Sequence, residues 1–140
     1  MYGGFTMSRR KQRITAIVCF YMYFFNKRDI LDIIQDFQES FVDEATDDEY
    51  ATINDVTKQM MVDAIDNQQL IINKINSLLK KGWTFSRLDL VEQAILFMAI
   101  SELVYELDDK AVIINEAVEI AKLYASDQSY KMINGLLDNV

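Results

Sequence analysis

The chain of 140 residues has no histidine and no proline, a single cysteine and only four glycines. Without histidine it lacks the commonest general base and the commonest zinc ligand, and one cysteine, Cys19, cannot form an internal disulfide. Because proline and glycine are the residues that most often interrupt helices, their scarcity favours long helices. We therefore expect a helical protein without a metal centre, a cofactor or catalytic residues.

Acidic residues are absent from the first 28 positions of the chain. That stretch carries six basic residues, whereas the rest of the chain carries eight basic and 22 acidic ones, and the formal net charge is −8. A basic end on an acidic body can present a charged footprint to phosphates or anionic lipid. Because the net charge is −8, we expect the isolated protein to be a poor general binder of nucleic acid.

Residues 8–28, SRRKQRITAIVCFYMYFFNKR, join a basic start to an apolar stretch, as signal peptides and membrane anchors do. The stretch lacks a small-residue cleavage site and falls short of the roughly 20 apolar residues that a spanning helix needs. We therefore expect a cytoplasmic protein that does not bind membranes, with a first helix that begins near an N-cap at Ser8.

Apolar residues in this segment recur at helical spacing and predict a stripe that faces the core. The predicted stripe comprises Ile14, Ile17, Val18, Tyr21, Met22 and Phe25. Phe20, Tyr23 and Phe24 fall outside it, and the periodicity leaves open whether they pack in the core or in an interface. The cations at the start of this helix oppose its dipole, which indicates that they meet an anion.

The same periodicity predicts six further helices. They cover residues 30–41, 49–66, 67–81, 88–106, 114–124 and 127–138. The expected helix ends are Asp47 or Asp48 as an N-cap, Lys80-Lys81-Gly82 as a C-terminus, and Ser86 with Asp89 in capping-box spacing. Neither strand alternation nor an internal repeat is evident, so the expected fold class is all-α.

The C-terminal third carries a distinctive order of residues. The informative blocks are Glu102-Leu103, INEAVEIAK at 114–122 and KMINGLLD at 131–138, preceded by RRKQR at 9–13 and Tyr21. In order and spacing these blocks resemble the NusB family of transcription antitermination factors, most specifically over residues 112–138. The resemblance implies a compact bundle of about seven helices in two packed subgroups, formed by residues 8–140 after a flexible tail at residues 1–7.

The function that this resemblance implies is that of a non-enzymatic RNA-binding protein. Its expected partners are the boxA element of nascent rRNA leader transcripts, ribosomal protein NusE and the antitermination complex of RNA polymerase. When alone, the protein is expected to be a monomer or a homodimer.

The resemblance also implies residues that contact RNA. These are Arg9, Arg10, Lys11, Arg13, Tyr21, Gln128, Ser129, Lys131 and Met132. Arginine can pair with phosphate through two hydrogen bonds or stack on an unpaired base, and tyrosine can stack. Gln128 and Met132 replace the acidic residue and the phenylalanine that are usual in the family.

Contacts with NusE are expected from three residues, Glu92, Phe97 and Ser101. The family commonly has an arginine and a tyrosine at the last two positions, whereas Glu92 matches an acidic family position and is the best single candidate. Asn115-Glu116, at the start of a predicted helix, is interpreted as a capping arrangement.

Three alternatives stay open on the sequence alone. A helical adaptor of NusB-like fold would retain protein binding with lost or altered RNA binding. The helical module of an RNA methyltransferase would need a further catalytic domain, for which 140 residues leave no room. An independent enzyme would need a nucleophile, and Cys19 lies in an apolar helix without an evident activating partner.

Overall fold

The computed structural model describes residues 10–42 and 53–140, with the side chains of 41 and 42 left out. The predicted tail over 1–7, the predicted caps Ser8, Asp47 and Asp48, and Arg9 of the basic cluster lie outside these residues. Within the described ranges, no helix is both long enough and apolar enough to cross a bilayer.

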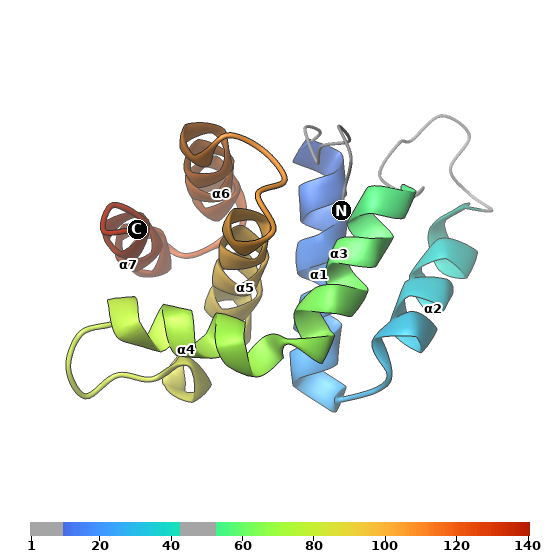
Figure 1. Cartoon of the computed structure of the whole chain (residues 1–140), viewed down its shortest axis with the longest axis horizontal. Coiled ribbons are helices and arrows are strands. Elements are labelled where there is room, and N and C mark those ends of the chain that lie inside the picture. The colour runs from blue at the N-terminus through green and yellow to red at the C-terminus, as the bar shows by residue number, and fades with distance from the viewer. Residues whose placement is uncertain (1–9, 43–52) are drawn as a thin grey trace.

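The described residues form seven α-helices and one 3-10 turn, and they contain no strand. In chain order the elements are α1 (Arg10–Asn26), α2 (Ile30–Val42), α3 (Asp55–Asp66), α4 (Gln68–Leu78), η2 (Phe85–Arg87), α5 (Leu90–Val104), α6 (Lys110–Tyr124) and α7 (Asp127–Leu137). Helices α1 to α3 lie on one side of the molecule and α4 to α7 on the other (Figure 1). The two groups meet mainly where α1 packs along α5. The predicted all-α class is confirmed.

Several predicted helix ends are wrong, and local backbone geometry explains each difference. Helix α3 begins at Asp55 because Asn54 caps it, accepting a hydrogen bond from the Thr57 amide at 2.8 Å. Helix α4 ends at Leu78, before the predicted Lys80-Lys81-Gly82 end, since Leu79 is already extended. Gly82 has a φ of +90°, a conformation that glycine adopts readily, and it forms part of the turn that follows.

Helix α5 does have a capping box, formed by Asp89 and Glu92 rather than by Ser86 and Asp89. The Asp89 carboxylate accepts a hydrogen bond from the Glu92 amide at 2.8 Å, and the Glu92 carboxylate accepts one from the Asp89 amide at 3.1 Å. This pair satisfies two backbone donors that would otherwise be left without partners at the helix start. The box therefore fixes α5 to begin at Leu90.

The predicted core stripe on α1 is wrong for three of its six residues, whereas Ile17 and Met22 are half-buried and pack against the core. Val18, Tyr21 and Phe25 are exposed, by 37%, 38% and 68%, respectively. Cys19 and Phe20, with Ala16 and Phe24, are the apolar residues that α1 buries. Apolar residues occur all around this helix, and α1 packs against α5, α2 and α3, so helical periodicity alone did not select the buried face.

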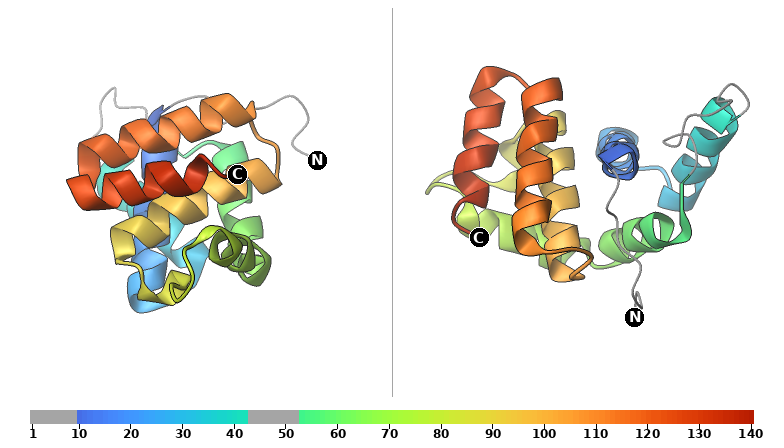
Figure 2. Two further views of the ribbon diagram at one scale, coloured as in Figure 1. Left: turned by 90° about the vertical axis from the view of Figure 1, so that its left-hand side faces the viewer. Right: turned by 90° about the horizontal axis from the view of Figure 1, so that it is seen from above.

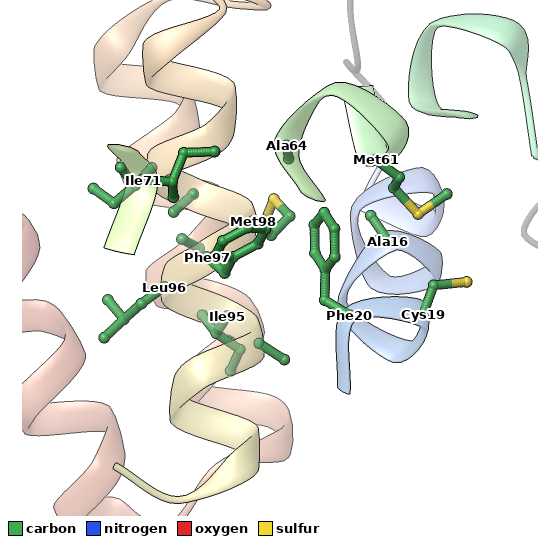
Figure 3. Close-up of a cluster of buried hydrophobic side chains, with 14 of the residues drawn as sticks. Ala16, Cys19, Phe20, Met61, Ala64, Ile71, Ile95, Leu96, Phe97 and Met98 are labelled. Atoms are coloured by element: carbon green, nitrogen blue, oxygen red, sulfur yellow. The ribbon is translucent and has the colours of Figure 1, made fainter. Parts of the chain in front are cut away.

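A cluster of phenylalanines joins the two groups of helices. Phe97 of α5 lies edge-on to Phe20 and Phe24 of α1, with ring centroids 4.8 and 5.0 Å apart, and Phe85 lies 5.3 Å from Phe24. Figure 3 shows Phe20 pointing from α1 toward Phe97. Such edge-to-face contacts add to the stabilisation from burial. Phe20 and Phe24 are thus core residues, which answers for them the question that the sequence left open.

Candidate nucleic-acid interface

Arg10, the first residue of α1, forms a two-pronged ion pair with Glu116 of α6. Its Nε and Nη2 atoms donate hydrogen bonds to the two oxygens of the Glu116 carboxylate, each at 3.0 Å. These hydrogen bonds raise the pKa of Arg10 and lower the pKa of Glu116. Since α6 begins at Lys110, Glu116 lies in its second turn and pairs across helices, so its interpretation as a cap is wrong.

Arg13 lies one turn further along α1 and is fully buried. Its Nε and Nη2 atoms donate to the Glu102 carboxylate of α5 at 2.9 to 3.2 Å, and Nη2 also donates to Asp108 at 3.2 Å. The sequence prediction that Arg13 faces RNA is therefore not supported by its position, because the guanidinium points away from solvent into the contact between α1 and α5.

Burial and hydrogen bonding act in opposite directions on the pKa values of this inner pair, and burial prevails for Glu102 but not for Arg13. Burial raises the pKa of Glu102 to about 7, and the hydrogen bonds from Arg13 act in the opposite direction. Burial also works against the charge of Arg13, but the hydrogen bonds to Glu102 and Asp108 outweigh it, so that the pKa of Arg13 is raised. The carboxylates therefore keep this arginine charged inside the protein.

The anion that the basic helix start requires is, for Arg10 and Arg13, a carboxylate of the protein itself. The sequence predicts an anion at this place, and the structure shows that for these two arginines it belongs to the protein. Lys11 is exposed next to them. The charge that the start of α1 can offer to an external phosphate is thus smaller than the sequence suggests, because Arg10 and Arg13 are already paired with carboxylates.

Tyr21 lies on an exposed face of α1. Eleven residues separate it from Arg10, which is close to three helical turns, so that the two side chains project from the same side about 16 Å apart along the axis. Tyr21, which the sequence places in the core, therefore has an exposed ring on the same face of α1 as Arg10. Phe25 lies one turn beyond it and is also exposed. A cation and aromatic rings along one face can bind phosphates and stacked bases.

The predicted residues of α7 divide into exposed and buried ones. Gln128 and Lys131 are exposed, whereas Met132 is half-buried and packs against the core. Ser129 is buried, and its Oγ donates to the Glu92 carboxylate at 2.6 Å, so it ties α7 to α5 and does not face outward. Seen from above in Figure 2, α6 lies between α1 and α7, which separates this group from Arg10.

The predicted partner residues lie mainly inside the protein. Phe97 and Ser101 are fully buried, and the Ser101 hydroxyl donates to the Phe97 carbonyl at 2.6 Å. Both positions face neighbouring helices because α5 is packed between α1, α4 and α6, so their prediction as surface contacts is wrong. Glu92 is half-buried, and its carboxylate is engaged by the capping box and by Ser129.

Comparison with known proteins agrees with this architecture. Residues 10–140 match the sequence profile of the NusB family. The chain belongs to the NusB family. The transcription antitermination protein NusB of Methylacidiphilum infernorum is 36% identical over 136 residues, which cover 96% of this chain and 90% of that protein. The NusB of a Bacillus cereus strain is 33% identical over 135 residues, covering 96% of this chain and 97% of its own length.

Solved NusB structures share the fold. NusB of T. maritima superposes with a TM-score of 0.76 at 29% identity, over 96% of this chain and 90% of that one. A chain from a structure of NusB and NusE with double-stranded RNA superposes with a TM-score of 0.68 at 21% identity, over 94% of each chain, and shows likeness of fold alone.

The sequence of this NusB family member does not show which residues of α6 surround Arg10. It predicts a local capping role for Glu116, and it predicts no role for Tyr124, which lies at the end of α6 and is 60% exposed. Tyr124 and Glu119 lie close enough to Arg10 to contribute to its raised pKa, after the larger effect of Glu116. No local pattern reveals these neighbours, because they become visible only once α6 is placed beside the start of α1.

Proposed function

We propose that this protein is a transcription antitermination factor that acts without enzymatic activity in the cytoplasm. In this proposal it binds boxA-type RNA of nascent rRNA leader transcripts together with ribosomal protein NusE, and the pair helps RNA polymerase to resist termination. The observation that carries the proposal is the family match over residues 10–140, together with relatives named as antitermination proteins that align over at least 90% of their length.

The first helix supplies the physical argument for RNA binding. Arg10 and Lys11 provide positive charge at its start, and Tyr21 provides an exposed ring on the face of Arg10. Single-stranded RNA offers phosphates to such cations and unpaired bases to such rings. Arg13 acts in this proposal as an internal support of α1 instead of a direct contact.

The second proposed contact lies at the start of α7, where Gln128 and Lys131 are exposed. RNA that reaches both places has to cross α6. The net charge of −8 opposes this binding, so we propose that NusE supplies the remaining positive surface and that the heterodimer is the form that binds RNA tightly. Glu92, at the start of α5, is the predicted NusE contact that keeps part of its side chain accessible.

Fluorescence anisotropy of a labelled boxA-like RNA tests this proposal. The titration is made with and without NusE, beside a scrambled RNA, and with the variants Arg10→Ala and Lys11→Ala. Lys74→Ala serves as the matched control, because Lys74 is an exposed cation on α4. Selective binding that needs NusE and is weakened by changes on α1 but not by Lys74→Ala is the expected result. Equal binding of both RNAs contradicts the proposal.

A helical adaptor without RNA selectivity is the second candidate. The observation that favours it is that Arg10 and Arg13 already pair with carboxylates of the protein itself. This pairing reduces the charge that α1 can offer to RNA. In the same titration, an adaptor would still bind NusE, and neither α1 variant would change the weak binding of RNA.

A further inference from the structure

The Arg10–Glu116 pair leaves one edge of the arginine available. A guanidinium has five N–H donors, and it can present two of them at once along either of two edges. Glu116 occupies the edge formed by Nε and Nη2. Among the described residues, none accepts a hydrogen bond from Nη1, so none of them occupies the edge formed by Nη1 and the second Nη2 hydrogen, which we call the open edge.

Arg10 is the more exposed partner of the pair. Its side chain is 41% exposed, whereas that of Glu116 is 19% exposed, so a ligand can reach the arginine more easily than the carboxylate. Beneath the pair, Arg13 ties α1 to Glu102 of α5 and to Asp108 of the connection that leads into α6. This inner ion-pair cluster holds the first turn of α1 in a fixed relation to α6, and hence Arg10 to Glu116.

From this geometry we propose that Glu116 is a positioning residue for RNA binding. It fixes the guanidinium of Arg10 so that the open edge receives a phosphate of the bound RNA through two parallel hydrogen bonds. A long side chain that is already ordered loses less conformational freedom when the ligand arrives. This inference rests on the proposed function, and it names an acidic residue as a contributor to the binding of an anion.

The inference predicts that removal of the Glu116 charge weakens RNA binding, whereas charge repulsion alone predicts that it strengthens RNA binding. A carboxylate close to a phosphate repels it, so removal of the charge alone strengthens binding. If Glu116 positions Arg10, its replacement by glutamine weakens binding, because a neutral amide cannot hold the guanidinium with two charge-assisted hydrogen bonds. The sign of the change therefore separates the two effects.

Glu119 provides the matched control on the same helix. It lies one turn beyond Glu116, contributes to the raised pKa of Arg10 through its charge, and pairs at 3.4 Å with Lys122. The variant Glu119→Gln thus removes the same charge from the same neighbourhood without removing a hydrogen bond that the structure gives to Arg10.

The experiment measures anisotropy of the boxA-like RNA with the NusE complex of each variant. We expect Glu116→Gln to weaken binding by about tenfold, the size of effect typical of directly coupled residues, and Glu119→Gln to leave it unchanged or tighter. In an Arg10→Ala background, Glu116→Gln is expected to have no weakening effect. Glu116→Asp keeps the charge but shortens the side chain, and we expect it to weaken binding as well. If the glutamine variant folds poorly, the aspartate variant tests the inference in its place.

Each result has a distinct meaning. Tighter binding by Glu116→Gln, or an equal loss in the Arg10→Ala background, overturns the positioning role while the proposed function stands. Absence of selective binding by the wild-type complex overturns the proposed function, and with it this inference, before any variant is considered.

Discussion

Arg10 and Arg13 lie three residues apart on one helix, and each forms a two-pronged pair with a glutamate, yet their surroundings differ completely. The Arg13–Glu102 pair has no exposed surface, whereas the Arg10–Glu116 pair lies at the rim of the molecule. When a buried ion pair loses one partner, the other partner is left as an uncompensated charge in the core. When an exposed pair loses one partner, water solvates the remaining charge, and little stability is lost. The comparison shows that burial, rather than residue type or pairing geometry, decides which of the two arginines can be reached from solvent.

The largest expected effect comes from breaking the inner pair. Arg13→Met leaves the Glu102 carboxylate buried without its main partner, and we expect a loss of about 3–5 kcal/mol in the free energy of unfolding. Urea denaturation at neutral pH measures the loss, with Arg10→Met as the control, for which less than about 1 kcal/mol is expected. Equal losses in the two variants would remove the distinction between the two arginines.

The loss in Arg13→Met is also expected to depend on pH. Burial already raises the pKa of Glu102 to about 7, and removal of Arg13 raises it further. A carboxyl group whose pKa is raised in the folded state favours folding at low pH, and this contribution is lost as the pH rises through the folded-state pKa. The difference between variant and wild type should therefore be larger at pH 8 than at pH 5.5, as measured by urea denaturation. A constant difference would contradict the burial argument.

At the rim, the expected effect falls on binding instead of stability. Arg10→Ala removes the proposed phosphate contact, so we expect the slope of log affinity against log salt to decrease in magnitude by about 0.7, the value for one contact with a single strand. Anisotropy titrations of the NusE complex over a range of salt concentrations measure this slope. The same titration with Lys74→Ala should leave it unchanged.

The smallest expected effect concerns the stability that the outer pair contributes. Arg10 lowers the pKa of Glu116 through its hydrogen bonds, so the pair stabilises the fold above the ordinary glutamate pKa, and this contribution is lost as the pH falls through the lowered value. Because the pair is partly exposed, we expect only a few tenths of a kcal/mol. Wild type should exceed Glu116→Gln by that amount at pH 7 and match it at pH 3 in urea denaturation.

The sequence predicted the helices well where apolar periodicity and caps act locally. Helix α7 was expected over 127–138 and is found at Asp127–Leu137. The buried face of α1 was missed, because this helix is apolar on all sides and receives neighbours on several of them. The local sequence pattern cannot show that Phe20 is buried and Phe25 exposed, because both have apolar residues around them in the sequence.

The candidate site was predictable only in part, for a related reason. The resemblance identified the basic start of α1, and Arg10 and Lys11 do lie at the surface. The partners of the arginines are separated from them by 89 and 106 positions in the chain, so no spacing rule connects them. Burial of Phe97 and Ser101 likewise follows from the packing of α5 among other helices, which only the assembled fold reveals.

The phenylalanine cluster couples positions that are far apart in the chain. The Phe97 ring is enclosed by Phe20, Phe24 and Phe85. A guanidinium in that enclosure would lose its hydration without gaining an acceptor. The free-energy effects of substitutions at these four sites are therefore expected to be non-additive, because each ring packs against at least one other ring of the cluster.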